Sequence, residues 1–376
     1  MPEDSHNSDL VIVGAGLAGV TAASKLGRNL RITLVDPRST FPAVFKAEKI
    51  EPEQADLLRK LGLLETLLPR ARRIREVRSY YGDKFFRITS TEQYGISYRD
   101  MVNTLRSALP PKVECKVGRV VKLSNGPDLQ VVTLDSGERL TCRLVLLACG
   151  LNGDLLRDLQ MKRVWIQRAQ SAAVGFSLAP TNGRPFPFDA LTYSLMSPRT
   201  GIDYVSLFPM DETLRANLFA FPFAESQWLQ RLVRDPEQEL PRILPKLSRA
   251  IGEYRVVGRM EASITNLYRT EGDPPDGIVL IGDTAQNVCP STGSGLTKIF
   301  TDVEVLSEHI HHWFETPGMN KGKLHSFFAD PRKIAADSAA LRTARYRKNA
   351  CSQRSLKWRV HRLRLHWARQ LKKMPN

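Results

Sequence analysis

Six residues near the start of the chain have the types and spacing of a phosphate-binding turn. The apolar run LVIVG at 10–14 passes directly into Gly-x-Gly-x-x-Gly at 14–19, which opens a helical stretch. In such a turn the first glycine permits a tight bend, the second lets backbone N–H groups approach a pyrophosphate, and the third allows close helix–strand packing. The N-terminus of the helix adds partial positive charge. We therefore predict that a dinucleotide pyrophosphate is bound by Gly14, Gly16, Leu17, Ala18 and Gly19.

A carboxylate stands where the adenosine half of that dinucleotide would lie. The run ITLVD at 32–36 predicts a second strand, and Asp36 ends it about twenty residues after the glycines. A carboxylate at this place accepts hydrogen bonds from ribose hydroxyls. A right-handed crossover through the intervening helix makes the two strands parallel neighbours. The turn and the carboxylate predict a dinucleotide site, but they do not distinguish FAD from NAD.

A second glycine-rich pattern lies in the last third of the chain. The strand GIVLIGD at 277–283 ends in Gly282-Asp283, and a predicted helix begins near 295. Between them stand Pro290, Gly293 and Gly295, and Asp302 follows on the helix. This spacing resembles the GD box of the flavoprotein aromatic hydroxylases, the family of p-hydroxybenzoate hydroxylase. The resemblance extends over roughly 8–75, 96–155 and 275–310, about half of the chain.

The resemblance implies that the cofactor is FAD. Asp283 then bonds to the ribityl chain, while the loop that carries Gly282, Pro290, Gly293, Gly295 and Leu296 lies against the pyrophosphate and the isoalloxazine. Lys46 takes the place of a family arginine that reaches the flavin side. Arg99, on a helix predicted over 96–108, is expected to touch the cofactor, and Val120 lies on a strand whose backbone meets the adenine. A glycine-rich helix start suits such an anionic ligand.

The pattern of elements predicts an α/β fold of two domains. The uninterrupted apolar run LVLLA at 144–148 indicates a strand buried on both faces, which is typical of a parallel sheet. The segment from about 165 to 265 alternates like an antiparallel sheet. We expect a Rossmann-like FAD-binding domain with a parallel sheet, formed by residues 8–75, 96–160 and 270–320. An antiparallel substrate domain, residues 76–95 and 161–269, is inserted into it. A helical, basic C-terminal tail is expected over 321–376.

Two sets of apolar residues have predicted positions within these domains. The leucines at 57, 61, 64 and 68 follow helical spacing, which predicts one helix over 52–68 with a core-facing stripe. Aromatic residues on the antiparallel segment are predicted to line a substrate pocket over the flavin, and the alternative is that they form the core of the sheet. These aromatic residues are Phe208, Phe219 and Phe221, with Phe223 beside them.

The reaction that the resemblance implies is monooxygenation. In the family, reduced FAD and oxygen form a C4a-hydroperoxide, which hydroxylates or epoxidises a small aromatic or apolar molecule while the protein excludes water. Because the flavin makes the new bond, no catalytic side chain is predicted. NADPH or NADH is the implied reductant, but the family's nucleotide-binding segment is replaced here by CGLNGD at 149–154. That departure leaves open a separate flavin reductase as partner.

One stretch of the GD box supports a different activity. PSTGSGL at 290–296 also resembles the isoprenoid reductases of the same superfamily, so a flavin-dependent dehydrogenase or reductase of an isoprenoid-like substrate is the alternative. The WxWxIP element of the related tryptophan halogenases is missing from the sequence. Five cysteines without CxxC spacing or neighbouring histidines argue against a disulfide framework and against a zinc site. We expect reduced thiols and no metal.

The net charge of +16 is concentrated in the tail, where residues 342–373 carry many Arg and Lys. Apolar residues at 356, 360, 363, 367 and 371 lie on one helical face with cations around them. Such a helix suits peripheral contact of residues 355–373 with an anionic membrane, and the alternatives are docking on an acidic partner or on the protein itself. No nucleic-acid-binding motif accompanies the charge. A polar start and the lack of a long apolar run favour a cytoplasmic location.

Overall fold

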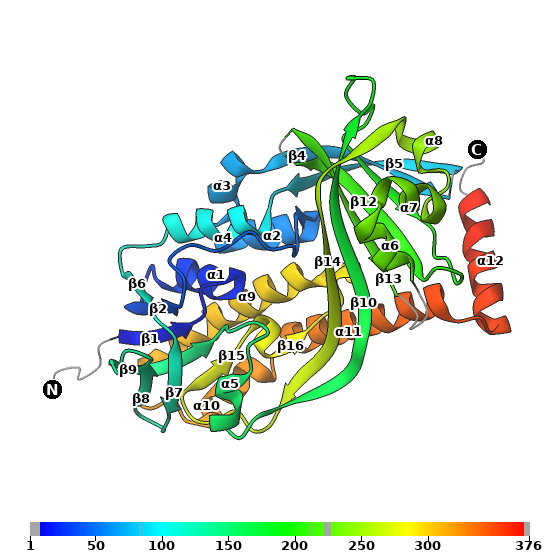
Figure 1. Ribbon diagram of the computed structural model, residues 1–376. Coiled ribbons are helices and arrows are strands. Elements are labelled where there is room, and N and C mark those ends of the chain that lie inside the picture. Colours follow the sequence, from blue (N-terminus) through cyan, green and yellow to red (C-terminus); the bar gives the residue numbers. More distant parts are fainter. Residues whose placement is uncertain (1–7, 83, 211, 222–226, 372–376) are drawn as a thin grey trace.

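Two sheets and a set of helices make up the protein (Figure 1). The computed structural model describes residues 8–82, 84–210, 212–221 and 227–371, with backbone alone at 366–371. One sheet has seven strands and the other nine. This mixed α/β architecture, with one mainly parallel and one mainly antiparallel sheet, confirms the predicted fold class.

The seven-stranded sheet forms the centre of the part that is predicted to bind the dinucleotide. Its path is β6-β2-β1-β9-β8-β7, and β15 pairs with the free side of β9. Strands β1, β2, β6, β9 and β15 are parallel, and apolar side chains bury both faces of β1. The strands are β1 Ser8–Val13, β2 Ile32–Asp36, β6 Val113–Val117, β7 Val120–Ser124, β8 Gln130–Leu134, β9 Arg139–Leu147 and β15 Ile278–Leu280.

The helices that pack on this sheet come from three separate parts of the chain. They are α1 Leu17–Leu26, α2 Pro52–Leu61, α3 Leu64–Leu67, α4 Tyr98–Ser107, α5 Asp154–Asp158, α9 Ser294–Glu315 and α10 Lys321–Phe328. The prediction of one helix over 52–68 was wrong, because Gly62 ends α2 in the left-handed region at φ 72°. Glycine enters this region without the steric cost that other residues meet, so the leucine stripe continues on a second, short helix.

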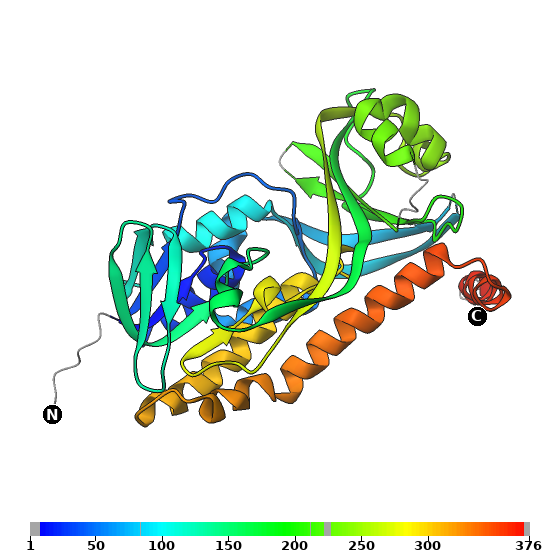
Figure 2. The same cartoon turned by 60° about the horizontal axis from the view of Figure 1, so that its bottom comes forward.

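The nine-stranded sheet has the order β16-β14-β10-β13-β12-β11-β4-β5-β3 and is antiparallel except between β11 and β4. Its strands are β3 Lys49–Ile50, β4 Arg72–Tyr81, β5 Lys84–Gly95, β10 Lys162–Pro180, β11 Ala190–Ser194, β12 Ile202–Met210, β13 Thr213–Ala220, β14 Tyr254–Glu271 and β16 Gln286–Asn287. The long strands β10 and β14 run from one half of the molecule to the other (Figures 1 and 2).

The two faces of this sheet have different partners. Side chains of β10, β12 and β13 that point to one face form an apolar cluster with α6 Trp228–Arg234, α7 Pro236–Ile243 and α8 Leu247–Ile251. Sequence patterns did not predict these helices, which are short, and α7 has Pro241 in its interior. The opposite face carries Tyr204, Ser206, Arg215 and Asn217. Strand neighbours alternate between faces, so these four share one face. This second face is directed at the first sheet's part of the molecule, because Tyr204 bonds to Ser291 and Arg215 to Glu48.

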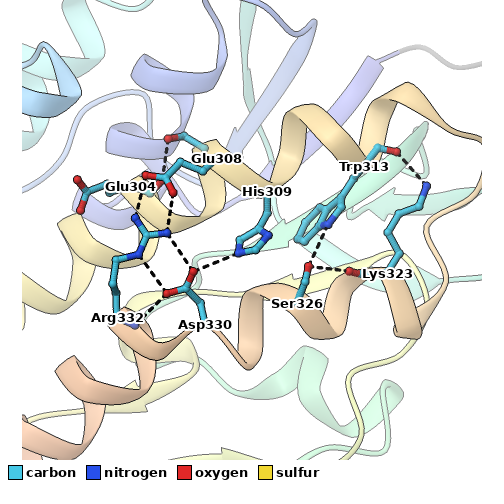
Figure 3. A network of polar contacts seen from close by, with 9 residues as sticks. Glu304, Glu308, His309, Trp313, Lys323, Ser326, Asp330 and Arg332 are labelled. Atoms are coloured by element: carbon cyan, nitrogen blue, oxygen red, sulfur yellow. Dashed lines mark hydrogen bonds and ion pairs between the residues drawn. The ribbon is translucent and has the colours of Figure 1, made fainter.

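Two further helices, α11 Pro331–Ser352 and α12 Leu356–Leu371, end the described chain. Figure 2 shows α11 running along the molecule, from the part built on the seven-stranded sheet to the part built on the nine-stranded sheet. At its start, Arg332 and Asp330 form a network with Glu308 and His309 of α9 (Figure 3). His309 is half-buried there. In the described part of the chain, no helix is both long and apolar enough to cross a membrane.

Candidate cofactor site

The three glycines of the first motif have different surroundings. A Cβ on Gly14, where φ is 101°, would lie 2.5 Å from the Ala148 carbonyl oxygen, and one on Gly19 would lie 1.8 Å from that of Gly14. Both positions therefore require glycine for packing within the protein. A Cβ on Gly16 would meet only Phe41 Cε2, at 3.8 Å, among the described residues. Gly16 thus borders open space, as expected where a ligand approaches the backbone.

Two helices begin at these motifs behind N-cap glycines, which have no side chain to cap the helix. They are α1, which follows Gly16, and α9, which follows Gly293. Helices α10 and α11, in contrast, begin at capping side chains, those of Asn320 and Asp330. The first N–H groups of a helix need acceptors, and an anion can supply them. The cradle at Gly16 and the uncapped start of α1 therefore fit a pyrophosphate.

Asp36 lies at the end of β2, next to the glycine turn. Its carboxylate accepts hydrogen bonds from the backbone N–H of Ala15 at 2.8 Å and of Arg38 at 3.0 Å. Arg106 Nη2 lies 3.4 Å from the same carboxylate and also donates to the Ala15 carbonyl oxygen. Val120 lies near Asp36 as well, because Gly118, two residues before it, donates its N–H to the Asp36 carbonyl oxygen. Sequence reasoning missed Arg106, whose role depends on how α4 packs beside the turn.

The GD box meets both the first motif and the segment after β2. A Cβ on Gly282, where φ is 58°, would lie 3.1 Å from Ala18 Cβ. Lys46 Nζ lies 4.0 Å from Asp283 Oδ2 and 5.3 Å from the centre of the Tyr98 ring. Side chains from three distant parts of the sequence therefore share one place. This is the grouping that an extended dinucleotide would need along its length.

Tyr98, rather than the predicted Arg99, is the residue of α4 that faces this site. The Leu17 N–H donates to the Tyr98 hydroxyl over a long 3.4 Å, and the tyrosine is buried. Burial and the negative charge of Asp283 raise the pKa of Tyr98, so its hydroxyl stays protonated. Arg99 is exposed, with its Nε 3.5 Å from Asp100 Oδ1. A shift of one residue along a helix turns a side chain by about 100°, which accounts for the difference.

A buried ionic cluster supports the GD box from behind. The Gly282 N–H donates to Asp302 Oδ2 at 2.9 Å. Lys298 Nζ and Lys333 Nζ lie 3.0 and 2.8 Å from the same carboxylate, which is 1% exposed. Burial opposes ionisation of Asp302, but the two ammonium groups outweigh it and hold the pKa of Asp302 below its usual value. Asp302, which the GD-box spacing included, therefore holds the loop in place.

The predicted aromatic residues fall into different environments. Phe208 is fully buried in a cluster with Ile74 and Val77, and Phe221 is buried in another. Phe219 is half-buried, and its ring centre lies 4.9 Å from that of Tyr204. The Tyr204 hydroxyl donates to the Ser291 carbonyl oxygen of the GD-box loop at 3.0 Å. Phe219 therefore reaches this loop through Tyr204, and Phe221 shares its cluster with Cys289 of the loop. Phe223 is outside the described residues.

A polar cluster on the second sheet lies beside Lys46. Glu48, two residues on, forms a two-point ion pair with Arg215 of β13, at 2.8 and 2.9 Å. Arg215 Nη2 also donates to Glu261 of β14 at 2.6 Å. Burial raises the pKa of Glu48, although Arg215 and Asn217 partly oppose the shift. Sequence patterns did not single out any of these four residues, because each is an isolated polar position on a strand or loop.

Comparisons with known proteins agree with this architecture. The model of one family, described as lycopene cyclase protein, matches residues 9–351. No match was found among curated proteins. Many solved structures match, among them two Pseudomonas proteins and a hydroxylase in complex with FAD.

The p-nitrophenol 4-monooxygenase PnpA of Pseudomonas putida superposes with a TM-score of 0.74 at 18% identity, over 94% of this chain and 91% of that one. PqsL of P. aeruginosa, in complex with 2-aminobenzoylacetate, superposes with a TM-score of 0.69 at 19% identity, over 91% of this chain and 97% of that one. Aklavinone-11 hydroxylase, in a ternary complex with FAD and aklavinone, superposes with a TM-score of 0.65 at 20% identity, over 90% of this chain and 68% of that one. The resemblance to flavin-dependent aromatic hydroxylases is thereby confirmed at the level of the fold.

Proposed function

Because the chain belongs to the lycopene cyclase protein family, with the fold of flavin-dependent monooxygenases, we propose that it is an FAD-dependent oxidoreductase. The observation that carries this proposal is the meeting of Lys46 with Asp283 beside the open backbone of Gly16. In the proposed complex, the pyrophosphate lies at Gly16 and the start of α1, the ribose of adenosine at Asp36, and the ribityl chain at Asp283. Lys46 supplies positive charge beside the flavin half.

The reaction we propose is oxygenation of a small aromatic or apolar molecule. Bound FAD, once reduced, supplies the electrons with which oxygen is activated, and the protein binds the substrate beside it and excludes water. The second sheet supports this role, because the face with Tyr204 and Phe219 is joined to the GD-box loop through Ser291. PnpA, whose name includes p-nitrophenol as substrate, and PqsL, seen with 2-aminobenzoylacetate, act on or bind aromatic molecules.

A second candidate function is redox or other flavin-dependent chemistry on an isoprenoid-like substrate. The family description, lycopene cyclase protein, favours it, as does the wording PSTGSGL at 290–296. Such an enzyme would leave molecular oxygen out of its product. Incorporation of labelled oxygen therefore separates the two candidates.

The source of electrons is either NADPH or NADH or a separate flavin reductase. The segment 149–154, which replaces the family's nucleotide-binding segment, is held by Arg163. Its guanidinium donates to the carbonyl oxygens of Gly150, Leu151 and Asn152. Nη1 and Nη2 of Arg163 are thus engaged by the backbone of this segment. Because the segment departs from the family's sequence and is held by this internal contact, we propose a separate reductase as the electron donor.

The test begins with the purified full chain and its visible spectrum. We expect a yellow protein, or a colourless one that turns yellow with added FAD. The protein is then mixed with NADPH or NADH without oxygen while absorbance near 450 nm is followed, the band of oxidised flavin. Loss of the band would contradict the need for a separate reductase. A chain that holds no FAD under any condition would overturn the proposed function itself.

We also propose peripheral contact of α12 with an anionic membrane. One side of the helix packs on the protein through Trp358 and Leu365, which join an apolar cluster with α11. A stripe on the remaining surface stays exposed, with Leu356 at 72%, Val360 at 38% and Leu363 at 57%. Exposed cations flank it, and α12 contains no acidic residue. Apolar side chains between cations suit the interface of an anionic bilayer.

A further inference from the structure

Three buried residues, Glu48, Arg215 and Asn217, form a cluster with Glu261, whose side chain is 40% exposed. The cluster lies between the two parts of the proposed active site. Lys46 of the same segment approaches Asp283, and Phe45 lies under Arg215, with the guanidinium carbon 5.3 Å from the centre of its ring. From the other side, Arg215 and Asn217 are on the face of β13 that also carries Phe219. The cluster therefore occupies the region where a substrate would lie between the flavin end of the site and the second sheet.

The charges of this cluster exclude one class of ligand. The guanidinium of Arg215 is engaged by both oxygens of Glu48 and by Glu261. Arginine often binds the carboxylate of a substrate, but here two carboxylates already share one cation. The side chains of Glu48 and Arg215 are each 6% exposed, so water screens their charges weakly. A further carboxylate would meet net negative charge.

One acceptor in the cluster lacks a donor. The Asn217 side-chain oxygen Oδ1 is buried and has no hydrogen-bond partner among the described residues. The residue is 5% exposed, and Ser206 stands directly opposite on β12. A buried acceptor without a donor destabilises the fold, so native structures seldom keep one without a use. A purely structural ion pair between Glu48 and Arg215 would not need this arrangement.

From these observations we infer that Glu48, Arg215 and Asn217 form the polar end of the substrate site and that this end binds a neutral hydroxyl or amino group. The Asn217 oxygen and the Glu48 carboxylate accept from the donor group, and Arg215 holds Glu48 in position. A substrate with a carboxylate at this end is rejected. The inference rests on the proposed function, because it presupposes a flavin next to the cluster.

The test uses the FAD-loaded full chain at pH 7 and three probes of similar size: phenol, aniline and benzoate. Phenol and aniline are neutral donors at this pH, whereas benzoate is an anion. Binding is followed through the change that each probe causes in the flavin band. We expect phenol and aniline to bind at least about ten-fold more tightly than benzoate, which corresponds to about 1.4 kcal/mol.

Three variants identify the groups that cause this preference. Glu48→Gln should strengthen benzoate binding about ten-fold, because it removes a negative charge and keeps the shape. Asn217→Leu should weaken phenol and aniline binding about ten-fold and leave benzoate unchanged. Glu239→Gln is the matched control, since Glu239 forms a similar two-point pair with Arg231 among the helices on the other face of the sheet. It should behave as the unmodified chain does.

Three results would overturn the inference: benzoate binding as tightly as phenol, Glu48→Gln behaving as Glu239→Gln does, or no saturable binding of any probe. Each of these can occur in a protein that holds FAD normally, so each leaves the proposed function standing. Failure of the proposed function is separate and visible beforehand, because the protein then fails to take up FAD.

Discussion

Lys46 Nζ lies 4.0 Å from Asp283 Oδ2, although 236 residues stand between them in the sequence. The lysine belongs to the segment after β2, and the aspartate follows β15 of the same sheet. The two side chains are partly exposed, at 37% and 27%, so water still reaches them and a ligand can take the place of that water. This pair supplies an acceptor and a cation at one place, as the flavin half of FAD requires.

The first prediction concerns this pair. Asp283→Ala and Lys46→Ala should each weaken FAD binding about ten-fold, because one loses an acceptor for the ribityl hydroxyls and the other a nearby positive charge. Flavin fluorescence during titration of the FAD-free protein measures the dissociation constant. Arg99→Ala is the control, since Arg99 is exposed and paired with Asp100. A loss with Arg99→Ala as large as with Lys46→Ala would contradict the arrangement.

The second prediction separates two glycines of one motif. Gly16→Val should weaken FAD binding at least about 100-fold, yet change the free energy of unfolding by less than about 1 kcal/mol, because a side chain there enters open space. Gly19→Ala should destabilise the protein by about 2 kcal/mol or more, because its Cβ collides with the Gly14 carbonyl oxygen. Urea unfolding and FAD titration of both variants decide the matter. Equal loss of stability in the two would show that Gly16 serves packing alone.

The third prediction concerns the ionic cluster behind the GD box. Asp302→Ala removes the buried carboxylate that Lys298 and Lys333 share and leaves both with Asp337 alone, which is 24% exposed. Loss of one partner from a buried ion pair costs roughly 3–5 kcal/mol, and because Asp337 remains we expect a loss near the lower end of that range in the free energy of unfolding. Asp154→Ala, on the surface helix α5, should change it by less than about 0.5 kcal/mol. Similar stabilities of the two variants in urea would refute the structural role of Asp302.

The fourth prediction concerns pH and the network in Figure 3. Hydrogen bonds from Arg332 hold the pKa of Asp330 and of Glu308 below their usual values. Carboxylates with a lowered pKa stabilise the folded state above their unfolded pKa, near 4, and this contribution is lost as the pH falls below it. Arg332→Ala should therefore cost about 1 kcal/mol at pH 7 and less at pH 3. A cost that stays constant between these pH values would argue against the electrostatic cause.

The fifth prediction concerns the exposed stripe of α12. The full chain should float with vesicles of phosphatidylcholine and phosphatidylglycerol, but not with phosphatidylcholine alone, because the helix is cationic. Serine at 356, 360 and 363 should abolish flotation, whereas serine at three exposed apolar positions elsewhere, 88, 129 and 264, should not. Sedimentation of the same variants tests the alternative occupant, a second copy of the chain. Dimerisation that the α12 variant abolishes, without flotation of the unmodified chain, would overturn membrane contact.

Much of the cofactor site could be predicted from the sequence, because its parts are short and continuous. The glycine spacing at 14–19 encodes a turn whose backbone geometry few other residues allow, and the apolar runs before Asp36 and Asp283 encode buried parallel strands. The stripe at 57, 61 and 64 was read correctly as core, although Gly62 divides its helix. In each case, a local periodicity or a local steric requirement is enough to specify the element.

The tertiary structure decided which side chains meet. Tyr98 rather than Arg99 faces the turn, and Arg106 reaches Asp36, because packing sets the rotation of helix α4. Glu48 pairs with Arg215 because packing decides which face of the second sheet meets the segment after β2. These contacts join residues far apart in the chain, and no single segment carries a pattern that reveals them. The sequence by itself therefore determined the backbone cradle for a dinucleotide. The polar environment beside it was decided only when the segment after β2, helix α4 and the second sheet packed together, because their sequences carry no signal of one another.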